Sequence, residues 1–274
     1  MRIYCFGDLH GNVYALEACL RHMDSLKPDV VYCLGDLVGW LPFGDRTLRR
    51  MRSLRLPTVA GNHDLMVAGL FTDHPRQLDR MQATAYNAGL LAHAPDDPEY
   101  LLGLPLMIEK PDHVAVHHSP FHLPEAGNAP HIGNFDYLDE AALEGALPRW
   151  KSFPQRVILS GHDHLPAIYE LPGGIDAPTV ANVTVHKPTT TGSVTVRLKA
   201  DARYWVKGGS VGGPYRDGVP QANAVLLDDS AETITLFRIP YPWEQLLKEL
   251  SENRFFSNIP TIRRYMELLK GSSG

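Results

Sequence analysis

The sequence is poor in cysteine, with only Cys5, Cys19 and Cys33 among 274 residues. An odd number of cysteines within apolar stretches does not indicate a disulfide framework, so we expect three reduced thiols in the core. No apolar run reaches the roughly 18 residues that a membrane-spanning helix needs. The first residues also lack the charged and apolar segments of a secretory signal peptide. These absences predict a cytoplasmic protein that is not held in a membrane.

Neither sign of charge dominates the composition. Lys and Arg number 26 against 31 Asp and Glu, so the net charge is −5 with His neutral. A weakly acidic chain without a basic stripe is a poor non-specific binder of nucleic acid, whose backbone is negative. The 44% of hydrophobic residues is ordinary for a globular protein. Because no long polar linker interrupts the chain, we expect one domain over residues 1–274, and its oligomeric state is left open.

Short apolar runs alternate with helical periodicity over the first 165 residues, which is typical of βαβ units in an α/β fold. The expected strands cover 2–6, 29–34, 57–60, 113–116 and 157–159, and the expected helices cover 13–26, 45–54 and 75–93.

The rest of the chain is richer in strand patterns. Residues 171–206 predict a β-hairpin insertion or a cap, with strands over 179–186 and 193–198. A further hairpin is expected over 222–227 and 232–239, and helices are expected over 243–270. Residues 271–274, Gly-Ser-Ser-Gly, have the composition of a cloning remnant, and we give them no structural role.

Polar clusters follow five of the apolar runs, and four of the five contain glycine. They are Gly7-Asp8-Leu9-His10-Gly11-Asn12, Gly35-Asp36, Gly61-Asn62-His63-Asp64, His117-His118 and Gly161-His162-Asp163-His164. Ligands bind beyond the carboxyl ends of strands in α/β sheets, so the five clusters would meet if these strands are neighbours. Each cluster alone has an ordinary interpretation as a helix cap, a turn or a solvated loop. Their joint occurrence predicts a metal site.

The candidate ligands offer oxygen and imidazole nitrogen without thiolate. Such a set suits Mn, Fe, Co, Zn or Ni better than Ca or Mg alone, and Mn is our first expectation. One metal ion takes about four to six ligands, whereas a larger set with a bridging carboxylate suits two ions. The seven candidates are Asp8, His10, Asp36, Asn62, His117, His162 and His164.

The order of these motifs resembles the calcineurin-like metallophosphoesterase superfamily. Within it, the sequence is most similar to the small prokaryotic phosphoesterases of the YfcE-like and diadenosine-tetraphosphatase-like branch. Gly35-Asp36-Leu37-Val38-Gly39 and the late Gly209-Ser210-Val211-Gly212 loop carry that likeness. The resemblance implies a four-layer fold, in which a two-sheet β-sandwich is flanked by helices.

The resemblance also implies roles for single residues. Asp8, His10, Asp36 and His164 would hold one metal ion, and Asp36, Asn62, His117 and His162 the other. A metal-bridging hydroxide would attack phosphorus. His63 would act as general acid or hold a phosphate oxygen, and Asp64 would orient His63 and raise its pKa.

Other residues are weaker candidates for the site. Arg216 is a candidate phosphate clamp, because its planar guanidinium matches a phosphate. Asn12 and Ser210 are candidates for orienting ligands or substrate, and Trp40 for stacking on a leaving group.

The sequence departs from this branch in two places. His117-His118-Ser119-Pro120 stands where the branch has His-Gly-Ser-Pro, so His117 is the expected ligand and His118 lies behind the ligands or faces the substrate. Lys207-Gly208 stands where Asn-Pro usually precedes the late loop.

The favoured function is hydrolysis of phosphodiester or nucleotide phosphoanhydride bonds in small substrates. The alternatives are a phosphomonoesterase acting on proteins or small molecules, and a metal-bearing interaction module without turnover. Activity on a chromogenic diester with added Mn would separate the enzymes from the module.

Overall fold

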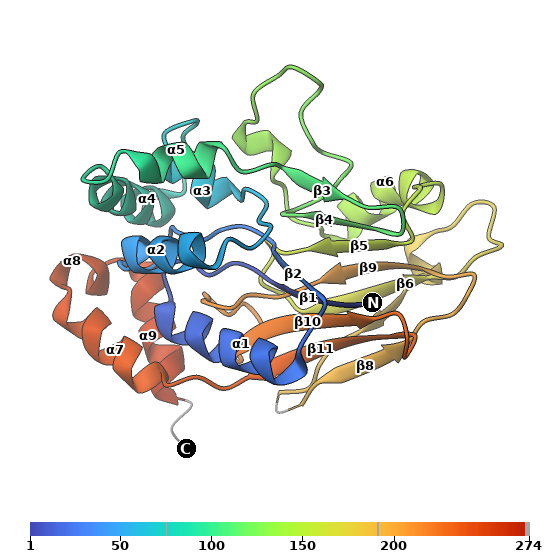
Figure 1. The fold of residues 1–274 in the computed structure, drawn as a ribbon. Helices are drawn as coiled ribbons and strands as arrows, with labels where there is room; N and C mark the ends of the chain where they lie inside the picture. The colour runs from blue at the N-terminus through green and yellow to red at the C-terminus, as the bar shows by residue number, and fades with distance from the viewer. Residues whose placement is uncertain (75, 191, 272–274) are drawn as a thin grey trace.

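The computed structural model describes residues 1–74, 76–190 and 192–271 (Figure 1). In these residues, one five-stranded sheet has the order β2 (Val30–Cys33), β1 (Arg2–Phe6), β10 (Ala222–Asp228), β11 (Thr233–Ile239) and β8 (Val194–Arg197). Strands β1 and β2 are parallel, and β10 runs antiparallel to β1. This arrangement places the carboxyl ends of β1 and β2 at one edge of the sheet.

The second sheet contains the middle part of the chain. Over the same described residues it has six strands in the order β3 (Met107–Glu109), β4 (His113–Val116), β5 (Val157–Ser160), β9 (Arg203–Lys207), β6 (Ala167–Leu171) and β7 (Thr184–His186). Strands β4, β5 and β9 are parallel to one another, whereas β3, β6 and β7 pair antiparallel to their neighbours.

The helices cover the outer faces of the two sheets. They are α1 (Val13–Leu26), α2 (Gly44–Leu54), α3 (Asn62–Val67), α4 (Leu78–Leu91), α5 (Asp96–Leu102), α6 (Glu140–Lys151), α7 (Trp243–Glu252), α8 (Arg254–Ser257) and α9 (Pro260–Gly271), with 3₁₀ turns η1 (Ile132–Asn134) and η2 (Val180–Asn182). In Figure 1, α1 and α7–α9 gather on the side of the first sheet, and α6 lies beside β4 and β5. The result is the expected sandwich of two sheets between helices.

Side-chain alternation along the strands builds the layers. Ile3 and Cys5 of β1 point into the apolar core between the two sheets, where they meet Leu159 of β5. Tyr4 and Phe6 of the same strand point the other way, into the core under the helices. This alternation is the period-2 pattern of a strand that is buried on both faces.

Two sequence-based expectations about strands are wrong. Residues 57–60 form only an isolated bridge between Cys33 and Thr58, because Ala60 turns away to donate its N–H to the Pro105 carbonyl. Residues 171–206 are not a hairpin, since β7 pairs with β6 in one sheet and β8 pairs with β11 in the other. The segment therefore adds an edge strand to each sheet. These strands bond to backbone groups of β6 and β11 that would otherwise be unpaired. Residue 191 of this segment lies outside the described residues.

Cys5, Cys19 and Cys33 are buried free thiols, as the sequence predicts. Burial raises the pKa of each thiol, so all three stay protonated near neutral pH. Among the described residues, no helix has both the length and the apolar character needed to cross a membrane.

The core between the sheets allows a stability prediction. Leu159→Ala should lower the free energy of unfolding by about 2–5 kcal/mol, because it leaves a cavity at a fully buried position. The same substitution at Leu102, which is 45% exposed at the end of α5, should change it by less than about 0.5 kcal/mol. Urea unfolding of both variants measures the difference, and equal losses would contradict this description of the core.

Candidate metal centre

The predicted ligands follow the carboxyl ends of four strands, two from each sheet. Asp8 follows β1 and Asp36 follows β2 in the first sheet, whereas His117 follows β4 and His162 follows β5 in the second. Backbone hydrogen bonds join these loops, among them Asp8 N–H to the Gly35 carbonyl (2.8 Å) and Gly161 N–H to the His117 carbonyl (2.9 Å). The clusters predicted to converge therefore lie side by side, and each candidate ligand is at most 5% exposed.

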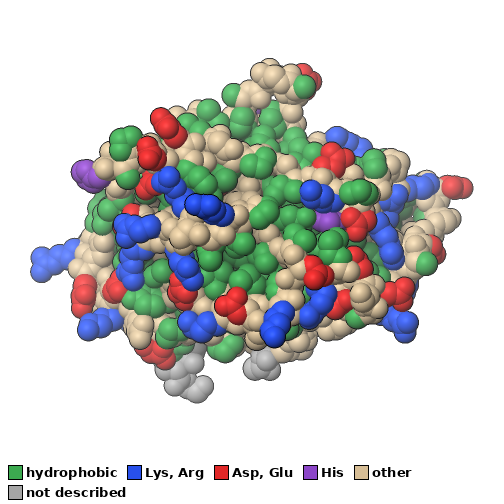
Figure 2. All heavy atoms as spheres, in the orientation of Figure 1, with side chains coloured by type: hydrophobic (Ala, Val, Ile, Leu, Met, Phe, Trp, Pro, Cys, Tyr) green, Lys and Arg blue, Asp and Glu red, His purple; other side chains and the backbone are tan. Residues whose placement is uncertain are grey.

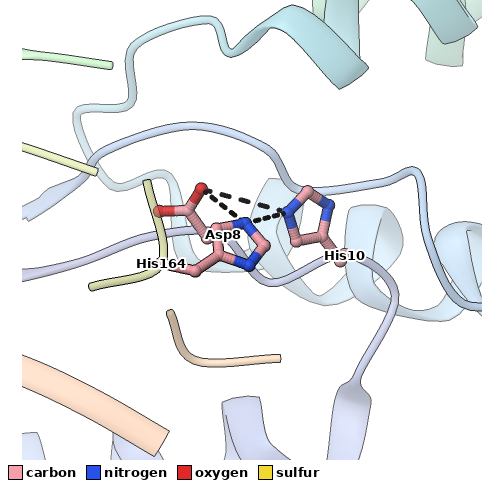
Figure 3. A group of neighbouring side chains, drawn as sticks. All are labelled: Asp8, His10 and His164. Atoms are coloured by element: carbon pink, nitrogen blue, oxygen red, sulfur yellow. Dashed lines mark hydrogen bonds and ion pairs between the residues drawn. The ribbon is translucent and has the colours of Figure 1, made fainter. Parts of the chain in front are cut away.

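One group of candidate ligands consists of Asp8, His10 and His164 (Figure 3). The His10 and His164 Nε2 atoms lie 2.9 Å apart. Asp8 Oδ1 is 3.4 Å from His164 Nε2 and 3.9 Å from His10 Nε2. Three ligand atoms thus face a common point.

A second group consists of Asp36, His117 and His162. His117 Nε2 is 3.3 Å from both Asp36 Oδ2 and His162 Nδ1. The Asn62 Oδ1 atom, at the start of α3, lies 3.0 Å from His162 Nδ1 and 3.3 Å from His117 Nε2. Asp36 Oδ2 is also 3.6 Å from His10 Nε2, so this one oxygen lies between the two groups.

The four imidazoles are each oriented by a backbone carbonyl. His10, His117 and His164 bond through Nδ1 to the carbonyls of Val38 (3.2 Å), Leu34 (2.6 Å) and Pro214 (2.7 Å). His162 bonds through Nε2 to the carbonyl of Phe135 (3.1 Å). A carbonyl only accepts, so the bonded nitrogen carries the proton and the other nitrogen presents a lone pair to the cluster.

Burial favours the neutral imidazole at two of these four positions. Burial lowers the pKa of His10 to about 3 and lowers that of His162 well below its usual value. Burial would also lower the pKa of His117, but the neighbouring Asp36 carboxylate outweighs it and raises the value to about 9. A metal ion beside Asp36 would take the place of that proton.

Most of the candidate ligands have an unusual backbone conformation. Asp8, His10, Asp36, His162 and His164 all have φ between 49° and 72°. This left-handed region costs a residue with a side chain roughly 1–2 kcal/mol. Such strain concentrates at functional sites, because the surrounding structure holds a side chain where its chemistry needs it.

Two glycines of the motifs make room for the carboxylates. A Cβ added to Gly61 would collide with Asp36 Oδ1, and one added to Gly161 would collide with Asp8 Oδ2. Both carboxylates also accept backbone N–H groups, Asp36 from His63 (2.8 Å) and Asp8 from His162 (3.0 Å). The glycines thus allow the carboxylates to be fixed against backbone.

The donor set therefore fits two metal ions. Two carboxylates, four oriented imidazoles and one amide oxygen face one another, with few protons between them to form hydrogen bonds. Lone pairs facing each other in a buried place are costly unless a cation lies between them. No thiolate takes part, so the set suits Mn, Fe, Co, Ni or Zn.

His63 lies directly beside the first group. Its ring is 4.7 Å from that of His10, and with His10 and Asp36 it forms another set able to hold a metal. Burial and the nearby His10 lower its pKa well below the usual value, and its Nδ1 has no hydrogen-bond partner among the described residues. In this state the His63 imidazole is neutral.

The prediction that Asp64 orients His63 and raises its pKa is wrong. The Asp64 carboxylate instead accepts backbone N–H groups from Asp36 (2.8 Å), Leu37 (2.8 Å) and Gly61 (3.0 Å). Burial, and next the Asp36 charge, raise the pKa of Asp64 to about 7. Asp64 therefore fixes the loop that carries Asp36, because a side chain at the third position of α3 points back over the helix N-terminus.

The weaker candidates have mainly positioning contacts. Asn12 caps α1 by accepting from Ala15 N–H (3.0 Å), and Ser210 donates to the Asp8 carbonyl (2.9 Å). The ring of Trp40 lies 5.6 Å from that of His63. The ring of His118 lies 5.2 Å from that of His162.

Lys207, Tyr137 and Arg80 also surround the centre, although the sequence did not predict it. Lys207, at the end of β9, forms a buried ion pair with Asp163, which stands between two ligands. Tyr137 stacks on His162 with ring centroids 5.0 Å apart, and Arg216 lies over the ring of Tyr137. Arg80 of α4 also bonds to the Tyr137 hydroxyl. Of these, only Lys207 had a signal in the sequence, because Lys207-Gly208 stands where the branch has Asn-Pro. Tyr137 and Arg80 lie outside any motif.

Comparisons with known proteins show the family and the fold of this chain. The calcineurin-like phosphoesterase family model matches residues 1–166. The crystal structure of a metallophosphoesterase from Sphaerobacter thermophilus aligns with 26% identity and a TM-score of 0.71, over 96% of this chain and all of that one. A hypothetical protein from Pyrococcus horikoshii OT3 shares the fold at 18% identity and a TM-score of 0.62, over 95% and 96% of the two chains.

YfcE, a phosphoesterase from E. coli, aligns over 88% of this chain and all of its own at 15% identity, with a TM-score of 0.39. No curated protein matches the chain. The family model covers more than half of the sequence, and its match ends just after the last two candidate ligands, His162 and His164. The chain belongs to the calcineurin-like phosphoesterase family.

Proposed function

We propose that this protein hydrolyses phosphodiester or phosphoanhydride bonds of small substrates at a two-metal centre. The observation that carries the proposal is the orientation of four buried imidazoles, each anchored through one nitrogen and presenting the other to the cluster. Such anchoring is typical of metal-binding histidines.

The chain offers a separate ligand set for each of two ions. Asp8, His10 and His164 would hold one, Asn62, His117 and His162 the other, and Asp36 both. Bound metal ions would neutralise phosphate oxygens and supply a nucleophilic water near neutral pH. Among the ions that fit, we propose Mn, because two oxygen-donor carboxylates and an amide accompany the imidazoles.

We assign proton donation to the leaving oxygen to His63. It follows the ligand Asn62 directly, and its ring lies between those of His10 and Trp40. A phosphate bound nearby would raise the pKa of His63 by its negative charge and so favour the protonated, donating form. Asp64 supports this role indirectly, by fixing the Asp36 loop on which His63 also rests.

Small phosphate esters or nucleotides are the proposed substrates. On the face of the molecule drawn in Figure 2, Lys and Arg are interleaved with Asp and Glu, without a continuous basic stripe. A nucleic-acid backbone needs such a stripe, whereas one phosphate group needs only a local cation. Arg216, exposed beside Tyr137 and His162, is the proposed phosphate-binding cation.

The test compares hydrolysis of bis(p-nitrophenyl) phosphate and p-nitrophenyl phosphate before and after Mn is added to purified protein. We expect metal-dependent turnover that is faster for the diester. A faster monoester rate would favour the phosphomonoesterase. Two bound ions without turnover of any phosphate ester or anhydride would favour the non-catalytic module.

Asp36 lies between the two ligand groups, so removing its negative charge should cause a large loss of bound metal. Asp36→Asn should reduce the metal content from two ions per chain to at most one and lower turnover by more than about 100-fold. The matched control is Asp24→Asn on the exposed side of α1, which should retain both ions. Elemental analysis by mass spectrometry measures the content, and two tightly bound ions in the Asp36 variant would contradict the assignment.

The role of His63 predicts a loss of rate without loss of metal. His63→Ala should lower kcat by about 100- to 10,000-fold while the protein still holds two ions. His93→Ala, at an exposed position after α4, is the matched control. A fall in metal content would instead make His63 a ligand, and an unchanged rate would remove its role.

A further inference from the structure

Two arginines meet at one exposed tyrosine beside the metal centre. Tyr137 is 40% exposed, and its ring stacks on that of His162 at 21°. Arg216 donates to the Tyr137 hydroxyl and lies over its ring, with Cζ 4.1 Å from the ring centroid. Arg80 Nη1 lies 3.4 Å from the same hydroxyl oxygen. We call Arg80, Tyr137 and Arg216 the arginine cluster.

Arg80 is held in a fixed orientation. Its Nε and Nη2 atoms bond to the two oxygens of Asp73, with Nη2 2.6 Å from Oδ1. Asp73 is 6% exposed, so this pairing is shielded from solvent. The remaining donor group of the fork points to Tyr137 over a distance that is long for a hydrogen bond. The Arg80 guanidinium is therefore already oriented before a substrate binds, and its Nη1 group makes only a weak bond to the protein.

The cluster carries more positive charge than the protein balances. Arg216 has no carboxylate within ion-pair distance among residues 1–74, 76–190 and 192–271, and Asp73 neutralises only Arg80. Two guanidinium groups share one phenolic oxygen, and the repulsion between them favours binding of an anion. The cluster lies beside the metal centre, since Tyr137, which both guanidinium groups contact, stacks its ring on that of His162.

We propose that Arg80 and Arg216 bind a second phosphate group of the substrate, next to the one held at the metal centre. This inference rests on the proposed function and narrows it to substrates with two or more consecutive phosphates, such as nucleoside or dinucleoside polyphosphates. Water would attack one phosphorus and release a proton to solvent, the bond to the bridging oxygen would break, and the leaving phosphate would take a proton from His63, which the bound phosphates hold in its protonated form. Two guanidinium groups match the charge and the planar, two-point bonding of that leaving phosphate.

The first test compares two substrates of the metal-loaded full chain, diadenosine triphosphate and bis(p-nitrophenyl) phosphate, which has one phosphate. Arg80→Met and Arg216→Met should each lower the ratio of kcat/KM for the triphosphate to that for the diester by about tenfold or more. Arg49→Met, at a 77% exposed position on α2, is the matched control and should leave the ratio unchanged. Because Arg216 is exposed, its variant remains informative even if loss of Arg80 disturbs folding.

The second test measures binding without turnover. Calorimetry on metal-loaded protein compares α,β-methylene-ADP, which has two phosphates, with AMP, which has one. Wild-type protein should bind the diphosphate more tightly, and each arginine variant should lose about tenfold of that preference.

The results distinguish failure of the second phosphate subsite from failure of the proposed function. If both substrates lose rate equally and the binding preference persists, the arginines act on the scissile phosphate or only hold Tyr137, and the second subsite is wrong. If wild-type protein binds two metal ions but hydrolyses neither substrate, the proposed function is wrong, and the binding preference still decides the subsite.

Discussion

The main constraint on the structure is the electrostatic repulsion among the candidate metal ligands, which the protein alone does not relieve. Six side chains from loops after strands of both sheets, with Asn62 at the start of α3, bring lone pairs and two carboxylates together in a place from which water is largely excluded. Five of these residues have a left-handed backbone, and four imidazoles are oriented by carbonyls that also fix their tautomers. A folded chain keeps such an arrangement at a cost in stability, which cations bound between the ligands would offset.

The fold explains why the site can be built from two sheets. Parallel strands β1 and β2 end at the same edge of one sheet, and parallel strands β4 and β5 end at the matching edge of the other. The core between the sheets fixes these edges against each other, so a loop from either sheet can contribute a ligand. The two candidate ligand groups accordingly mix residues from both sheets.

Most of the centre was predictable from the sequence because six of the seven ligands follow a strand end in a short motif, whereas Asn62 stands at the start of α3. The spacing of Asp8 and His10, or of His162 and His164, is a local property of one loop. The role of Asp64 was not predictable in this way, because its hydrogen-bond partners lie on the loop after β2, up to 28 positions away. Arg80, Tyr137 and Arg216 come from three separate segments, and only the folded chain brings them together.

The strands of residues 171–206 show a similar limit to predicting the fold from the sequence. The strands expected over 179–186 and 193–198 are present at 184–186 and 194–197, while 180–182 form a 3₁₀ turn, and the predicted hairpin between them does not form. Adjacent strand patterns favour a hairpin by proximity alone. Here each strand instead completes the open edge of a different sheet, an outcome that depends on the position of β6 and β11 in the assembled sandwich.

The most direct test of the account is a count of metal ions by titration of chelator-treated protein with Mn, followed by diester hydrolysis on the same sample. The account predicts two ions per chain and turnover that appears only when both have bound. Failure to bind any transition-metal ion would contradict it, because the buried ligand cluster would then be stable without the cations that its geometry demands.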